Sequence, residues 1–318
     1  MFIQFSSRLV TFRAQEFYKE NRAAMFAGKL AGLLAVISIP SILKILVYTN
    51  QSSVPVTAYR RYIQTIFHML NWYEHDLKPG TKSWKSLEAV RKRHVISSKY
   101  AEKGNHGFIQ QKDMALTQFG FMGYITIRPD ILGIPVSRDN YEAFVHFWRV
   151  MGYMLGIQDR FNVCTDSWQT TKPRLEIMLN EIYRPFLEKA PPVFDSMATA
   201  LVDGLWCYNP MISAPSFVYY TKWMTNCSGY LYWETSLNAL DGDVDQNRKV
   251  LESLDWLSRF LLFLQVTFHS YLVNFAVFRW YFNTQIVFAT FLITYFPFLA
   301  FFKFGIKRSY VSILKGEK

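Results

Sequence analysis

His94 and Arg91 are the residues of this sequence whose types and spacing best fit a chemical site. They lie three positions apart in the segment VRKRH, so one helical turn would project them to the same face. An imidazole on a rigid helix is a common axial ligand of a haem iron, and a positive group beside it suits a haem propionate. A histidine beside an arginine is more often a structural hydrogen-bonding group, so the pair alone leaves both interpretations open.

Other types of site have weaker support in the sequence. His68 and His75 lie seven positions apart with no ligand pair between them, which argues against a non-haem metal centre. A G-x-S-x-G turn for serine hydrolysis and a glycine-rich phosphate loop are both missing. The net charge of +11 comes from scattered lysines and arginines rather than from a stripe, so we expect no nucleic-acid partner.

The elements that must position His94 are predicted to be helices. Apolar residues recur at helical spacing through most of the chain, and no convincing run of alternating strands is visible, so the sequence predicts a mainly α fold. One helix is expected over 57–77 and the next from Ser86, its N-cap, which carries Leu87, Val90, Arg91 and His94. Residues 30–43 are apolar but too short to span a bilayer, which predicts a buried helix kinked at Pro40.

The composition implies that much apolar surface must be covered by something other than water. Of the 318 residues, 51% are hydrophobic and only 19% are charged, so a membrane or a large cofactor is expected. Residues 281–302 carry no charge and are long enough to cross a bilayer; they are predicted to be a transmembrane or interfacial helix, with a core helix as the rival interpretation. The basic tail that follows favours anionic headgroups, and it predicts a cytosolic C-terminus if the segment spans the bilayer; it holds Lys303, Lys307, Arg308, Lys315 and Lys318.

Several motifs occur in an order that resembles a known family. They are the VRKRH string that ends at His94, the preceding Arg61-x-x-x-Thr65 pair, the run Gln111-x-Asp113-x-x-x-Thr117-x-x-x-Phe121, and Phe147-Trp148-Arg149-Val150-Met151-Gly152-x-x-x-Gly156. This order and spacing, from about Phe12 to Asn162, resemble the catalytic domain shared by the rubber oxygenases (latex-clearing proteins) and the endoplasmic-reticulum oxygenase of the mycophenolic acid pathway.

The resemblance implies roles for particular residues. His94 would be the axial ligand of a haem b iron, and Arg91 would partner a propionate or the haem pocket. Arg61 and Thr65 would be the catalytic polar groups on the oxygen side, because a guanidinium and a hydroxyl can polarise bound dioxygen. The sequence departs from the bacterial members at two positions, with Ser98 in place of a further arginine and Gln64 in place of a distal lysine.

These observations predict a globin-like helical haem-binding domain over 1–280, the apolar segment 281–302 and the basic tail 303–318. The resemblance implies oxidative cleavage or oxygenation, with O2, of an unsaturated long-chain or isoprenoid lipid. It also implies association with a membrane, such as that of the endoplasmic reticulum. Two alternatives stay open, which are a haem or lipid carrier without the chemistry, and a membrane-attached helical scaffold in which His94 is merely buried.

Overall fold

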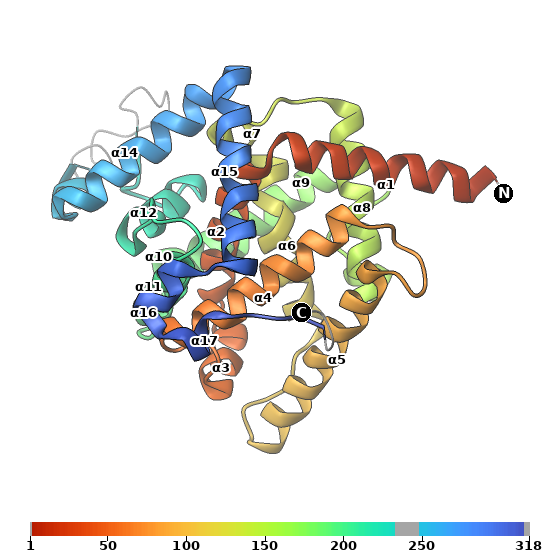
Figure 1. The fold of residues 1–318 in the computed structure, drawn as a ribbon, viewed down its shortest axis with the longest axis horizontal. Coiled ribbons are helices and arrows are strands. Elements are labelled where there is room, and N and C mark those ends of the chain that lie inside the picture. Colours follow the sequence, from red (N-terminus) through yellow and green to blue (C-terminus); the bar gives the residue numbers. More distant parts are fainter. Residues whose placement is uncertain (1, 233–247, 315–318) are drawn as a thin grey trace.

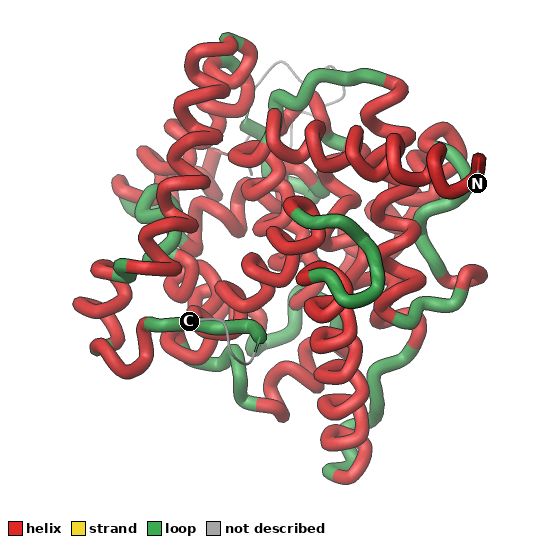
Figure 2. The backbone as a smooth tube through the Cα atoms, turned by 45° about the vertical axis from the view of Figure 1, so that its right-hand side comes forward, coloured by secondary structure: helices red, strands yellow, loops and turns green. Residues whose placement is uncertain are grey.

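The computed structural model describes residues 2–232 and 248–314, which form helices and loops with no strand among them (Figure 1, Figure 2). This confirms the predicted mainly α fold. The helices before residue 233 are α1 (Phe2–Glu20), α2 (Arg22–Ile37), α3 (Pro40–Thr49), α4 (Pro55–Glu74), α5 (Lys82–Lys103), α6 (Gln111–Ile127), α7 (Pro129–Leu132), α8 (Arg138–Leu155), α9 (Trp168–Met178), α10 (Arg184–Glu188), α11 (Phe194–Leu205) and α12 (Ala214–Met224).

Short irregular turns and further helices follow along the described chain. A π turn, Leu179–Tyr183, joins α9 to α10, and short 3-10 turns cover Asp159–Phe161 and Leu272–Asn274. The C-terminal helices are α14 (Trp256–Ser270), α15 (Ala276–Tyr295), α16 (Phe298–Phe304) and α17 (Ile306–Ser309).

α2 is the central helix of the fold. It is buried around most of its circumference, as expected for a helix that is apolar on nearly every face. It crosses α6 so closely that a Cβ atom on Gly32 would lie 1.8 Å from the carbonyl oxygen of Gly120, so only glycine allows this crossing. Around this pair, α1 packs on α8, and α4 packs on both α5 and α11.

The apolar segment 30–43 forms parts of two helices. α2 and α3 meet at an angle of 91°, and Pro40 occupies the first turn of α3, where its missing N–H costs nothing. The segment is largely buried, as predicted, and both helices contribute to the wall of a cavity described below.

The segment 281–302 also differs from a single helix. α15 ends at Tyr295, and α16 starts after Pro297 at an angle of 56° to it, because proline cannot continue a helix without losing a hydrogen bond. In the described residues no single helix is long and apolar enough to cross a membrane, whereas the bent pairs α2–α3 and α15–α16 meet that test only when each is taken together. Lys315 and Lys318 of the basic tail lie outside the described residues.

Polar contacts attach the C-terminal helices to the core. The side chain of Asn283 accepts from the N–H of Ala23 (3.0 Å) and donates to the carbonyl of Glu20 (2.7 Å), so it fills the break between α1 and α2. The Tyr59 hydroxyl donates to the carbonyl of Ser309 at 2.6 Å. In contrast, α15 buries only Ile286 and Ile293, so most of its apolar surface has no partner within the described chain.

Candidate functional site

A cavity of about 250 Å³ lies among α2, α3, α4, α5, α6 and α8. The polar lining comes mainly from α4 and α5, and the opposite wall is aliphatic. That wall, from α2 and α3, consists of Leu33, Val36, Ile37, Ile42, Ile45 and Leu46.

α4 presents one polar face to the cavity. Pro55 starts the helix at a position where its fixed φ is favourable, and the helix then runs without a break to Glu74. Arg61, Thr65 and His68 follow at intervals of four and three residues, so they share one face, and all three line the cavity. The structure therefore brings together the two predicted oxygen-side residues, Arg61 and Thr65, and adds a histidine.

α5 faces the cavity with His94, as the sequence predicts, but not with Arg91. The side chain of Thr81 accepts from the N–H of Trp84 and starts the helix one turn before Ser86. Arg91 and Arg93 are both exposed, but Arg93 lines the cavity with His94, whereas Arg91 belongs to a separate surface pocket. A Cβ on Gly156, which also lines that pocket, would lie 3.4 Å from Nε of Arg91.

His94 is held as a neutral imidazole. Burial lowers its pKa to about 4, and the charge of Arg61 acts in the same direction. Its Nδ1 atom is buried and has no hydrogen-bond partner among the described residues. A neutral imidazole with unused bonding capacity is the form in which histidine binds a metal.

Positive charge in the cavity is not balanced by neighbouring carboxylates. The guanidinium of Arg61 makes no hydrogen bond or ion pair with the described residues, and burial lowers its pKa. Arg93 donates to the amide oxygen of Gln64 at 3.0 Å rather than to an acid. Among the described residues that line the cavity, Asp113 carries the only carboxylate. It does not pair with either arginine but accepts hydrogen bonds from the Ser41 hydroxyl (2.7 Å) and the N–H of Gln110 (2.9 Å). The cavity is therefore suited to an anionic group on an otherwise apolar ligand.

His68 is a cavity residue that the sequence reasoning did not select. Its Nδ1 lies 2.8 Å from the hydroxyl of Ser86, which also accepts from Nε1 of Trp72 at 2.9 Å. Burial lowers the pKa of His68 to about 4, and the charges of Arg93 and His94 add to the effect. Its helical spacing from Arg61 and Thr65 was the signal that could have identified it.

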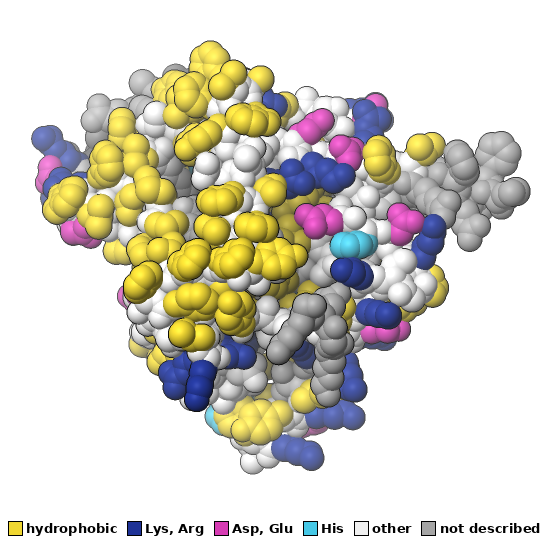
Figure 3. Space-filling model, viewed as in Figure 1, with side chains coloured by type: hydrophobic (Ala, Val, Ile, Leu, Met, Phe, Trp, Pro, Cys, Tyr) yellow, Lys and Arg dark blue, Asp and Glu magenta, His cyan; other side chains and the backbone are white. Residues whose placement is uncertain are grey.

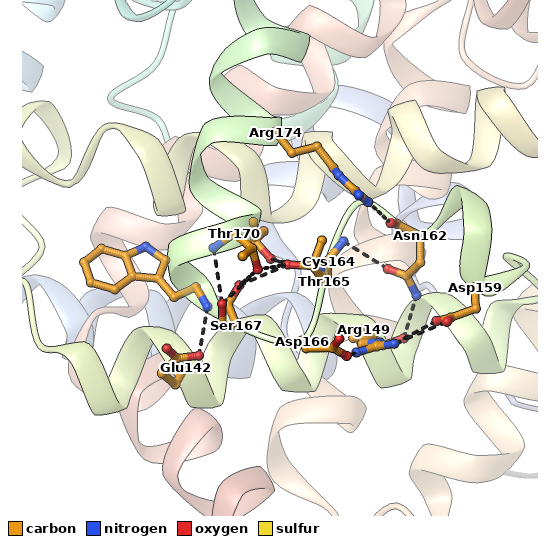
Figure 4. A network of polar contacts seen from close by, with 12 residues as sticks. Glu142, Arg149, Asp159, Asn162, Cys164, Thr165, Asp166, Ser167, Thr170 and Arg174 are labelled. Atoms are coloured by element: carbon orange, nitrogen blue, oxygen red, sulfur yellow. Dashed lines mark hydrogen bonds and ion pairs between the residues drawn. The ribbon is translucent and has the colours of Figure 1, made fainter.

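Asn162 belongs to a network of polar contacts that joins the loop after α8 to α8 and α9 (Figure 4). Gln118 donates both to the carbonyl of Trp148 (2.8 Å) and to Oδ1 of Asn162 (2.9 Å). Asn162 then donates to the carbonyl of Arg149, whose guanidinium pairs with Asp159 at 3.1 Å. This network fixes the side of the cavity that Gln118 and Trp148 line.

Comparisons with known proteins agree with this arrangement. The sequence profile of the family described as ER-bound oxygenase mpaB/B'/Rubber oxygenase, catalytic domain, matches residues 16–226, which include every helix that lines the cavity. Among solved structures, the chain is similar to latex clearing protein LCP in the closed state, with a TM-score of 0.53 and 15% sequence identity over 90% of this chain and 74% of that chain. No curated protein matches the chain.

Proposed function

This chain belongs to the family of ER-bound oxygenases and rubber oxygenases, whose catalytic-domain profile it matches, and on that premise we propose that it is a haem b-dependent oxygenase. Its proposed substrate is an unsaturated long-chain or isoprenoid lipid, which it would cleave or oxygenate with O2. The observation that carries the proposal is the single cavity in which neutral His94 and unpaired Arg61 face an aliphatic wall.

The residues of the cavity fit a haem by their chemistry. His94 supplies a neutral imidazole for the iron, and the aliphatic wall from α2 and α3 suits the porphyrin face. The propionates need a positive partner, and Arg93 lines the cavity without a carboxylate of its own. Arg91, to which the resemblance gives this role, lies outside the cavity, so we assign propionate binding first to Arg93.

When bound, the haem would supply the redox chemistry that activates dioxygen. The protein would contribute positioning and electrostatics. Arg61 would stabilise negative charge that develops on oxygen, because its partly buried guanidinium lines the cavity and has no hydrogen-bond acceptor among the described residues. The hydroxyl of Thr65 donates to the carbonyl of Arg61 at 3.1 Å, so its oxygen lone pairs remain available to accept a hydrogen bond.

A haem or lipid carrier is the second candidate function, and Gln64 favours it. This side chain is held by Arg93 and by a bond to the carbonyl of Ser312 (3.3 Å), so it is tied into the cavity rim rather than free to act on a substrate. A carrier needs the pocket and the iron ligand but no proton donor or base.

The ultraviolet–visible spectrum of the purified full chain after addition of haem tests the proposal. We expect a Soret band that His94→Ala weakens strongly, since removing a metal ligand costs most of the affinity. No Soret band in the parent protein would contradict any haem-based function. Oxygen-dependent conversion of a polyunsaturated or polyisoprenoid lipid, measured by mass spectrometry, then separates the oxygenase from the carrier.

We further propose that the protein docks on a membrane, with the endoplasmic reticulum as its location and its basic C-terminal segment on the cytosolic side. Hydrophobic side chains gather over α14, α15 and α16 (Figure 3), and Trp256, Trp280 and Phe302 are largely exposed there. The cations Lys303, Lys307 and Arg308 follow directly. This combination fits an interfacial surface through which an apolar substrate would arrive.

A further inference from the structure

His68 is a buried imidazole for which the proposed function has so far no use. It is 2% exposed and lines the same cavity as His94. Its Nε2 atom is buried and has no hydrogen-bond partner among the described residues. Because buried polar atoms are nearly always paired, this nitrogen requires an explanation.

The hydrogen bonds around Ser86 favour one tautomer of His68. The indole N–H of Trp72 can only donate, so the oxygen of Ser86 accepts it. The Ser86 hydroxyl in turn points to the carbonyl of His68 at 3.4 Å. All three contacts are then satisfied if Nδ1 of His68 carries the hydrogen and donates it to Ser86. This tautomer leaves an unprotonated lone pair on Nε2.

A lone pair on one ring nitrogen, with the other nitrogen fixed by an oxygen acceptor, is the arrangement typical of metal-ligating histidines. The neighbouring helices α4 and α5 pack directly on each other and bring His68 and His94 to one cavity. Resting on the proposed function, we propose that His68 is a second axial ligand, so that the haem iron is held between two imidazoles.

Two other polar groups on this face of α4, Gln64 and Thr65, are already engaged. The amide of Gln64 bonds with Arg93 and with the carbonyl of Ser312. The hydroxyl of Thr65 donates within its own helix. His68 is therefore the neutral side chain on this face of α4 whose ring nitrogen, Nε2, has no hydrogen-bond partner among the described residues. With both imidazoles bound to the iron, an external ligand would have to displace one of them.

Electron paramagnetic resonance and visible spectroscopy of the haem-loaded ferric protein test this assignment without an activity measurement. We expect a low-spin signal in the parent protein and its loss, with a high-spin signal in its place, in His68→Gln. The matched control is His146→Gln, because Nε2 of His146 is also buried and unpartnered but does not line the cavity. This control is expected to stay low-spin.

The outcomes separate the assignment from the proposed function. A parent protein that takes up haem but is high-spin, or a low-spin signal that persists in His68→Gln, overturns the role of His68 and leaves the haem function standing. A parent protein that takes up no haem refutes the proposed function itself. If His68→Gln does not fold, nitrogen hyperfine couplings in the parent protein labelled with 15N-histidine decide, since two imidazoles are expected and a single one contradicts the assignment.

Discussion

The helices within residues 16–226 and the C-terminal helices α14–α17 use aromatic side chains in opposite ways. In the first region, Trp148 is buried and Tyr73 stacks on Phe147 with ring centroids 4.7 Å apart. In the second region, Trp280 is 68% exposed and Phe302 is 90% exposed. Both regions are rich in aromatic residues, so composition alone does not distinguish a buried core from an exposed apolar surface.

The difference separates two requirements of the proposed oxygenase. A cavity that holds polar groups such as His94 and Arg61 in fixed positions needs a stiff and fully packed surround. A surface that takes up an apolar substrate must leave its aromatic side chains free in the isolated chain. The C-terminal helices meet the second requirement because polar contacts, such as those of Asn283, hold them to the core while their apolar faces stay open.

Paired tryptophan substitutions give the largest expected contrast between the two regions. Trp148→Ala empties a buried site and leaves the hydroxyl of Tyr73 without the indole donor that now lies 2.9 Å away, so we expect a loss of about 4 kcal/mol in the free energy of unfolding. Trp280→Ala removes an exposed side chain and should change it by less than about 0.5 kcal/mol. Urea unfolding of the haem-free protein measures both. Equal losses would show that the C-terminal aromatics belong to a common core.

Gly133 tests how the two regions join. Its φ is +64°, and a Cβ there would lie 2.2 Å from the carbonyl oxygen of His269 and 2.0 Å from Cγ1 of Val273. We therefore expect Gly133→Ala to cost about 3 kcal/mol, part from the positive φ and part from the forced separation of α7 and α14. Gly305→Ala is the control, since its φ is +78° in open space, and it should cost about 1 kcal/mol. Equal losses of unfolding free energy in the two variants would mean that α7 and α14 can move apart at no cost to accept the added methyl group.

The sequence predicted the helices and the cavity histidine His94, because helical periodicity and local motifs encode both. It did not predict the orientation of α5. The apolar spacing suggested a face shared by Arg91 and His94, but the cavity side is centred on Val90, Arg93, His94 and Ser97. Arg91 lies one position beyond that side. Which of two neighbouring arginines faces inward depends on how α5 packs against α4 and α8, and this is a tertiary property.

Two other differences have the same origin. Ser86 fits an N-cap by its sequence position, yet the helix starts earlier, at Thr81, and Ser86 holds His68 instead. The length of 281–302 suited one spanning helix, but Pro297 divides it. Side chains such as serine and proline have several local uses, and only packing against distant residues decides among them.

His269, at the junction of the two regions, should make stability depend on pH. It is buried, its Nδ1 lies 3.3 Å from the carbonyl of Leu132, and burial lowers its pKa from 6.5 to about 4. Between these values the unfolded chain binds a proton that the folded chain does not, so stability falls as the pH is lowered through that range. At pH 5 the loss is about 2 kcal/mol relative to pH 7.5.

His269→Gln is the variant that isolates this contribution. Unfolding free energies of the haem-free parent protein and of the variant, measured between pH 7.5 and pH 5, should diverge at high pH and approach each other at low pH. The same dependence on pH in both proteins would refute the role of His269. It would also indicate that the junction is open to water, and hence that the two regions are less firmly joined than the buried imidazole implies.

Binding to vesicles should give the smallest effect and sharpen the comparison most directly. Phe302→Asp removes the most exposed phenylalanine of the C-terminal surface and adds a negative charge, so we expect about tenfold weaker partitioning onto anionic phospholipid vesicles, with the thermal midpoint unchanged. Phe108→Asp makes the same change at an exposed phenylalanine of the other region and should leave partitioning unaffected. Sedimentation with sucrose-loaded vesicles measures both. Equal losses would show that charge alone drives adsorption, because the aromatic face of α14–α16 would then contribute no more than any other exposed surface.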